Sequence, residues 1–220
     1  MSEFNQCTIY NCEQRSDEWF DLRKGILTAS EFGPWLLKDS DKRSRDAREK
    51  AICKLVAQAA GGWEPPVFEN EAMKRGTLME PDAVAAFERW SCKKVTTVGF
   101  CRSNHGRFGC SPDGLIKGEN AGFEGKVPIS STHVLYRRAG VLPEVYKYQV
   151  HGSMAVTGAE SWWFQSYEPR LASFRIKIVR DSFTDELFEA LCQFSRELNQ
   201  AIAEESQAWE LENKVSGDAA

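Results

Sequence analysis

The chain has 220 residues, enough to bury one sizeable core without requiring a second domain. Its hydrophobic content of 42%, charged content of 27% and net charge of -4 are ordinary for a globular protein. No apolar run reaches the roughly 18 to 20 residues of a membrane span, and the start lacks the basic head and apolar centre of a secretory signal. We therefore expect one cytoplasmic domain over residues 1–220, with its core at about 15–210 and a disordered tail at about 215–220.

The first part of the chain predicts a series of helices. Ser16 can cap a short helix that Gly25 would end, and Ser30 can cap a second helix start soon afterwards. Two longer helical runs follow. The expected helices are at residues 16–25, 28–37, about 42–60 and about 69–90.

The middle of the chain changes to short runs rich in β-branched and aromatic residues, which predict strands. The expected strands are at residues 93–102, 106–111, 122–128, 161–169 and 172–180. Further helices are expected at about 131–139, 143–157 and 183–207. This order of helices, a central mixed β-sheet and flanking helices predicts an α/β or α+β domain.

Cysteine content and net charge exclude few classes of function. The seven cysteines include no C-x-x-C pair, so we expect reduced, mostly buried thiols and neither a zinc knuckle nor a redox dithiol. The negative net charge argues weakly against a nucleic-acid partner, because a metal-dependent nuclease can gather its carboxylates in one place and its basic residues in another.

The stretch SPDGLIKGENAGFEGKV, residues 111–127, carries the strongest chemical signal. Glu124 and Lys126 are two residues apart and so share one face of a strand, beside Asp113 on a neighbouring strand. Adjacent carboxylates repel unless a cation lies between them, and their hard oxygen atoms favour Mg²⁺ or Mn²⁺. Lys126 could orient the attacking water, favour its deprotonation and stabilise the charge on a pentacovalent phosphate.

The spacing P-D-x(10)-E-x-K is the phosphodiesterase pattern called PD-(D/E)-x-K, but alone it is only moderately specific. Solvated charges on a β-hairpin are the alternative interpretation of this stretch. Glu80, in the helical stretch RGTLMEPDAVAAF, would supply the third carboxylate that two metal ions need. An ordinary glutamate on a helix surface is the alternative there.

Five blocks of sequence occur in the order typical of one family and span roughly residues 15–180. They are LRKGILTASEF (22–32), RGTLMEPDAVAAFE (75–88), CSPDGLI (110–116), GFEGKVP (122–128) and YKYQVHGSMAVTGAESWWFQSYEPR (146–170). Together they resemble the lambda-exonuclease type of viral recombination nuclease, also called the YqaJ family.

The resemblance implies a restriction-endonuclease-like PD-(D/E)-x-K core and dependence on Mg²⁺, with Mn²⁺ able to substitute and two ions per site. It implies 5′-to-3′ digestion of one strand of linear double-stranded DNA, leaving a 3′ single strand for recombination by annealing. It also implies a ring-shaped homotrimer, a single-strand annealing protein as partner, and a phage or prophage origin in a bacterial cytoplasm.

The resemblance also assigns roles to single residues. The implied metal ligands are Glu80, Asp113, Glu124 and the carbonyl of Gly125, and Lys126 is the implied catalytic lysine, acting with the three acids. The implied pocket for the 5′-phosphate consists of Arg23, Ser30, Ser111 and Gln149, residue types that suit an anion site. Further implied contacts to DNA are Trp19, Lys42, Arg43, Arg45, Tyr146 and His151.

Some of these assignments stay open. Packing within the fold is the alternative role for Trp19 and for His151. The chain also departs from the family pattern at Gly125, where an apolar side chain is usual, and at His151, where a glutamine is expected.

Three functions are therefore compared. The favoured one is a metal-dependent 5′-to-3′ exonuclease acting on linear double-stranded DNA. The second is an endonuclease built on the same core, which would also cut closed circles. The third is a DNA-end-binding subunit without catalysis that loads an annealing protein, although the presence of all three acids and the lysine speaks against it.

Overall fold

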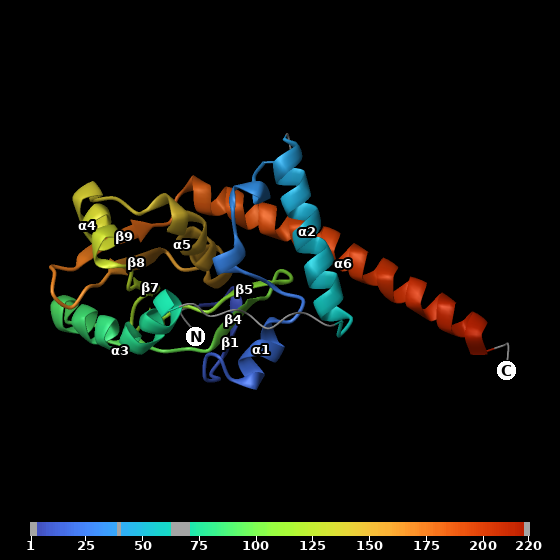
Figure 1. Cartoon of the computed structure of the whole chain (residues 1–220), viewed down its shortest axis with the longest axis horizontal. Helices are drawn as coiled ribbons and strands as arrows, with labels where there is room; N and C mark the ends of the chain where they lie inside the picture. Colours follow the sequence, from blue (N-terminus) through green and yellow to red (C-terminus); the bar gives the residue numbers. More distant parts are fainter. Residues whose placement is uncertain (1–3, 39–40, 63–70, 218–220) are drawn as a thin grey trace.

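The computed structural model describes residues 4–38, 41–62 and 71–217 and shows helices arranged around two β-sheets (Figure 1). The α-helices of these ranges are α1 (Asp17–Arg23), α2 (Lys42–Ala59), α3 (Glu71–Ser91), α4 (Ser130–Ala139), α5 (Glu144–Thr157) and α6 (Ser182–Gly217). The strands are β1 (Cys7–Tyr10), β2 (Leu27–Thr28), β3 (Val95–Thr96), β4 (Phe100–Ser103), β5 (Phe108–Cys110), β6 (Gly114–Ile116), β7 (Ala121–Lys126), β8 (Ser161–Ser166) and β9 (Phe174–Val179). Two short 3-10 helices, η1 (Ala29–Glu31) and η2 (Pro34–Leu36), follow β2.

The larger sheet has the strand order β3-β6-β7-β8-β9, with β7 and β8 parallel and the other neighbours antiparallel. Alternation along β7 turns Phe123 towards Phe87 of α3, with ring centroids 4.6 Å apart. Glu124 points to the opposite face, where Gln149 of α5 contacts it. The sheet therefore holds Glu124 between an apolar layer on one side and a helix on the other.

The smaller sheet has the strand order β1-β4-β5-β2, and it lies beside the central mixed sheet that the sequence predicted. The sequence pattern did not reveal β1, β2 and β6, because strands of two to four residues are too short to show alternation. Residues 111–113 cross from β5 in the smaller sheet to β6 in the larger one. The acidic motif thus begins where the two sheets meet.

The helix α5 is the central element of the core. Every residue from Val150 to Thr157 is buried, because α5 contacts both sheets and α6. Gln149 immediately precedes this buried segment, which fixes its position with respect to β7.

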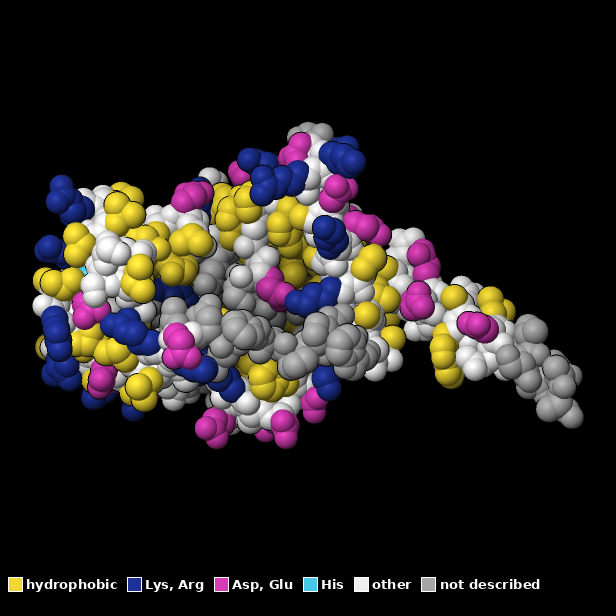
Figure 2. All heavy atoms as spheres, in the orientation of Figure 1, with side chains coloured by type: hydrophobic (Ala, Val, Ile, Leu, Met, Phe, Trp, Pro, Cys, Tyr) yellow, Lys and Arg dark blue, Asp and Glu magenta, His cyan; other side chains and the backbone are white. Residues whose placement is uncertain are grey.

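The helix α6 packs on the body through its first half and extends away from it in its second half (Figure 1). Its buried hydrophobic residues recur at helical spacing and are Leu187, Leu191, Phe194 and Leu198. In the projecting part Trp209 is exposed, and Figure 2 shows other hydrophobic side chains on this extension.

Two features of α6 bear on the sequence analysis. Residues 215–217, expected in a disordered tail, are helical, and residues 218–220 of that tail lie outside the described residues. Although α6 is 36 residues long, none of the described helices combines the length and apolarity that crossing a membrane requires.

The expected helix at residues 28–37 is replaced by the two 3-10 helices. Thr28 is the N-cap residue of η1 and Ser30 lies inside it, so Ser30 is not the predicted cap. The prediction for α1 is confirmed, since the hydroxyl of Ser16 accepts a hydrogen bond from the backbone N–H of Trp19 at 3.3 Å.

A pair of glycine substitutions tests the packing of β7 on β8. Gly122 lies opposite Trp162, and a side chain at position 122 would collide with the indole ring. Gly122→Ala should lower the free energy of unfolding by about 1–3 kcal/mol through overpacking. Gly76 lies inside α3 with open space around it, so Gly76→Ala should raise that free energy by up to about 1 kcal/mol. Urea unfolding measures both changes, and equal stability of the two variants would contradict this packing.

Candidate active site

Two acids, the lysine of the motif and a glutamine meet at the end of β7. The ammonium of Lys126 lies 2.5 Å from Oε1 of Glu124, and Nε2 of Gln149 donates to the same oxygen at 2.6 Å. Asp113 accepts a hydrogen bond at Oδ2 from the backbone N–H of Gly125, also at 2.6 Å. The structure thus brings these predicted residues into one group, which we call the carboxylate cluster.

Glu80 approaches the carboxylate cluster from α3 and is half-buried. Burial and, to a smaller extent, the negative charge of Asp113 raise the pKa of Glu80 to about 7, while Arg15 and Lys126 act in the opposite direction. Glu80 is therefore close enough to the cluster to share its electrostatics.

The other members of the cluster are also strongly perturbed. Burial raises the pKa of Glu124 to about 7, with Lys126 opposing the shift. Burial likewise raises the pKa of Asp113, against the effects of Lys126 and the N–H of Gly125. Although burial disfavours the charged form of Lys126, Glu124 and Asp113 raise its pKa above the ordinary value. The lysine therefore stays protonated at neutral pH.

One oxygen of the cluster is suited to bind a cation. Oε2 of Glu124 is buried and accepts no hydrogen bond from any residue that the structure describes, a costly state that a divalent ion would relieve. Within the described ranges, however, no three acidic, histidine or cysteine side chains already have the spacing of a metal site. The donor set fits a hard divalent cation, and the predicted set of three carboxylate ligands stays a prediction.

A second group, which we call the arginine cluster, lies at the start of the same motif. Nη1 of Arg23 and Nε1 of Trp19 both donate to Oγ of Ser111, at 3.0 and 2.9 Å. The guanidinium stacks 4.0 Å from the Trp19 ring centroid, and its Nη2 donates to Oγ1 of Thr28 at 3.3 Å. Ser30 joins through its hydroxyl, 3.4 Å from that of Thr28. Arg23, Ser30 and Ser111, predicted to bind one phosphate, are therefore neighbours.

An acid that the sequence analysis did not single out adjoins the arginine cluster. Glu31 accepts a hydrogen bond from Thr28 at 2.9 Å and pairs with Lys54 at 2.6 Å. Burial lowers the pKa of Arg23, and Glu31 partly offsets this effect. The arginine cluster therefore contains one partly buried cation, Arg23, whose charge is partly compensated by Glu31.

Other predicted residues lie elsewhere. Gln149 belongs to the carboxylate cluster and not to the arginine cluster. Tyr146 lies nearby, with its ring centroid 5.4 Å from the ammonium of Lys126. The expected duplex contacts on α2 are exposed in its first turn and belong to neither cluster; they are Lys42, Arg43 and Arg45.

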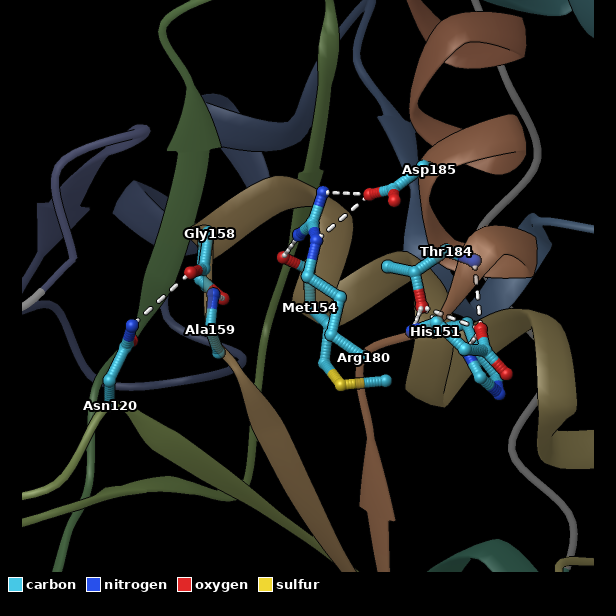
Figure 3. Close-up of polar contacts among 10 residues, drawn as sticks. Asn120, His151, Met154, Gly158, Ala159, Arg180, Thr184 and Asp185 are labelled. Atoms are coloured by element: carbon cyan, nitrogen blue, oxygen red, sulfur yellow. Dashed lines mark hydrogen bonds and ion pairs between the residues drawn. The ribbon is translucent and has the colours of Figure 1, made fainter.

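His151 is turned away from both clusters. Residues two apart on a helix point in nearly opposite directions, so His151 cannot share the face of Gln149. Its ring is buried, and Nδ1 lies 2.8 Å from the hydroxyl of Thr184 at the start of α6 (Figure 3). The structure therefore favours packing, the alternative left open for this residue.

Sequence reasoning missed several residues that position the site. Arg75, on α3, pairs with the buried Glu168 at 2.7 Å and donates to the carbonyl groups of Val127 and Pro128 just after β7. These contacts tie the helix of Glu80 to the strand of the motif. They join residues more than fifty positions apart, and no local pattern in the sequence signals them.

Comparison with known proteins places this geometry in context. A family model described as the YqaJ-like viral recombinase domain matches residues 18–160. No curated protein matches the chain significantly.

Solved structures are similar over most of the chain. An alkaline exonuclease, LHK-Exo from Laribacter hongkongensis, is 30% identical with a TM-score of 0.73, covering 89% of this chain and 100% of that chain. Its complex with dAMP gives 31% identity and a TM-score of 0.75 over the same shares. A phage related exonuclease from Haemophilus somnus 129PT is 13% identical, with a TM-score of 0.58 over 81% of this chain and 96% of that chain, and it supports the fold alone. The predicted restriction-endonuclease-like PD-(D/E)-x-K fold is confirmed.

The raised pKa values predict how stability depends on pH without metal. Glu80 and Glu124 have pKa values of about 7 in the fold against 4.5 ordinarily, so the folded state keeps protons that the unfolded chain releases. This contribution to stability is complete below about pH 4.5 and is lost as the pH rises through about 7.

Thermal unfolding in EDTA should therefore show the melting temperature falling across this pH window. Glu124→Gln removes one titrating group and should make the fall smaller, whereas Glu186→Gln, on the exposed face of α6, should not change it. A wild-type profile identical to that of Glu124→Gln would contradict the raised pKa of Glu124.

Proposed function

The chain belongs to the YqaJ-like viral recombinase family, and from this premise we propose that it is a Mg²⁺-dependent 5′-to-3′ exonuclease. The family and the similarity to alkaline exonucleases support a nuclease role in phage recombination. In the proposed reaction one strand of linear double-stranded DNA is digested, leaving a 3′ single strand for annealing. The proposal treats residues 1–220 as one nuclease domain.

The observation that carries the proposal is the junction of the two clusters. Ser111 lies in the arginine cluster and Asp113 in the carboxylate cluster, with Pro112 between them. An anion site and a phosphodiester-cleaving site are thus two residues apart. This arrangement suits an enzyme that holds a terminal phosphate and cuts next to it.

Glu80, Asp113, Glu124 and the carbonyl of Gly125 would hold the metal. The unpartnered Oε2 of Glu124 supports this assignment, and carboxylate oxygens favour Mg²⁺ with Mn²⁺ as a substitute, two ions per site being proposed. When bound, the metal would neutralise the acids and polarise the phosphate under attack.

Lys126 would act on the water and on the phosphate. Its ammonium is held by Glu124 at 2.5 Å, so it is fixed in position, and its raised pKa keeps it charged. A fixed ammonium can donate a hydrogen bond to the attacking water and stabilise the extra negative charge on the pentacovalent phosphate. Gln149, bonded to the same oxygen of Glu124, would restrict the rotation of this carboxylate.

Ser111 is well prepared to bind a phosphate. Its oxygen already accepts hydrogen bonds from Trp19 and Arg23, so both lone pairs are used and the hydroxyl hydrogen is left to donate. The guanidinium of Arg23 has further N–H groups beyond the two that contact Ser111 and Thr28. Together these donors suit the oxygens of a terminal 5′-phosphate.

The product class is part of the proposal. LHK-Exo was crystallised in complex with dAMP, a deoxynucleoside monophosphate. We propose that this chain likewise releases deoxynucleoside 5′-monophosphates from the end of the strand.

Membership of the family supports a proposal for partners and location. We propose a homotrimeric ring, a single-strand annealing protein as partner, and a bacterial cytoplasm with a phage or prophage origin. Exposed apolar residues support association with other chains; they are Ile129, Leu135, Val141 and Val145 around α4, and Trp209 and Leu211 on α6.

Substrate form tests the proposed function. Purified protein with Mg²⁺ should degrade linear duplex with 5′-phosphate ends and spare covalently closed circles, because only linear DNA offers a terminal phosphate. Gel electrophoresis of both substrates measures this. Loss of circles at the rate of linear DNA would favour the endonuclease, and binding of ends without cutting would favour the non-catalytic subunit.

Lys126→Ala is the matched control for this assay. It should keep DNA binding while losing roughly a hundredfold or more in the rate of cleavage, since one donor to the developing charge is removed. Near-normal turnover by this variant would remove the proposed role of the lysine.

Arg23→Ala tests the phosphate pocket. Loss of a charge-assisted hydrogen bond should reduce kcat/KM on 5′-phosphorylated ends by roughly tenfold or more and leave 5′-hydroxyl ends nearly unchanged. Lys24→Ala is the control, because this neighbouring cation is exposed and paired with Asp21. An equal loss on both types of end would contradict the assignment.

A further inference from the structure

The turn before α1 holds an arginine in an unfavourable backbone conformation. Arg15 has φ of 73°, in the left-handed region that glycine prefers. The turn is closed by a hydrogen bond from the N–H of Ser16 to the carbonyl of Glu13 at 3.2 Å. Glycine would fit this position at less conformational cost. An arginine here therefore suggests that its side chain has a role that offsets the strain.

The turn is fixed to the strand connection that carries Asp113. Nε2 of Gln14 donates to the carbonyl of Pro112 at 3.0 Å and to that of Val98 at 2.9 Å. Pro112 directly precedes Asp113, so Arg15 follows a residue that is anchored beside the carboxylate cluster. Residues 111–113 therefore have Arg23 attached at one end and the Arg15 turn attached in the middle.

The side chain of Arg15 is exposed and forms no hydrogen bond or ion pair with any residue in the described ranges. Arg15 directly follows Gln14, whose side chain donates to the carbonyl of Pro112 just before Asp113, and this places Arg15 at the rim of the carboxylate cluster. The other cations nearby are already engaged, since Lys126 pairs with Glu124 and Arg23 bonds to Ser111. Arg15 is thus a cation at this rim with its donors available.

We propose that Arg15 binds a backbone phosphate of the DNA next to the phosphodiester that is cut. A guanidinium presents a fork of N–H groups that matches phosphate oxygens, and an exposed arginine can reach them without prior desolvation. The inference rests on the proposed function, because it takes DNA as the substrate. It assigns Arg15 a contact that is separate from the terminal-phosphate pocket at Arg23.

Arg15→Gly separates this role from a structural one. Glycine suits the left-handed conformation, so the variant should melt at the wild-type temperature or higher. Its affinity for a short linear duplex, measured by fluorescence anisotropy with Ca²⁺ replacing Mg²⁺, should fall roughly tenfold. The slope of log K against log salt should become shallower by about 0.9, the value for one lost phosphate contact.

Two comparisons sharpen the measurement. The loss of affinity should be equal for 5′-phosphate and 5′-hydroxyl ends, and Arg15→Lys should recover most of the salt slope. Lys117→Gly is the matched control, because Lys117 is an exposed cation in the turn at the opposite end of the β6–β7 hairpin from the site. This control should keep the wild-type affinity and slope.

The outcomes are distinct. An unchanged affinity and salt slope in Arg15→Gly would overturn the proposal, as would a loss confined to 5′-phosphorylated ends. If Arg15→Gly does not fold, Arg15→Gln must show the shallower slope and Arg15→Lys must not. If the wild-type protein binds duplex through Arg15 but cuts no DNA end, the exonuclease proposal is rejected and the Arg15 contact is retained. If Arg15→Gly binds DNA as the wild type does and the wild type cuts normally, the Arg15 contact is rejected and the exonuclease proposal is retained.

Discussion

The contact between the half-buried Lys126 and the buried Glu124 is the interaction on which the rest of the site depends. Removing two charges from water is costly unless each charge is paired and hydrogen-bonded, and removing one partner alone would leave an uncompensated buried charge. One oxygen of Glu124 accepts from both Lys126 and Gln149, whereas the other has no hydrogen-bond partner among the described parts of the chain. The sheet around β7 must therefore hold Glu124 in place although only one of its two oxygens bonds to described residues.

Local spacing was enough to predict that Glu124 and Lys126 lie together on β7. Glu124 and Lys126 share a face because side chains alternate along a strand, and this needs no knowledge of the tertiary fold. The cap at Ser16 was equally predictable, since its partner is three residues away. The prediction that Glu80 and Arg23 belong to the site relied on resemblance to a family, because contacts between distant segments leave no periodic signal in one sequence.

The failures of the sequence analysis also have physical reasons. Proximity to Gln149 along the chain suggested that His151 faces DNA, yet the helical rotation between them turns the histidine into the contact with Thr184. The left-handed conformation of Arg15 comes from a turn closed on Glu13 and anchored to distant carbonyl groups, which composition does not reveal. Strands of two or three residues were also missed, because they are defined by hydrogen bonds to a neighbouring strand and not by a local sequence pattern.

Residues 111–113 give the two clusters a fixed separation. Ser111 contacts Arg23 and Asp113 contacts Gly125, while two residues of extended chain span at most about 7 Å. Pro112 restricts the backbone between them, and Gln14 holds its carbonyl, so this separation cannot easily lengthen. Under the proposed function, a strand whose terminal phosphate is bound at Ser111 presents its next phosphodiester to Asp113 and none further along. Removal of one nucleotide at a time then follows from the length of a short loop, without any recognition of the bases.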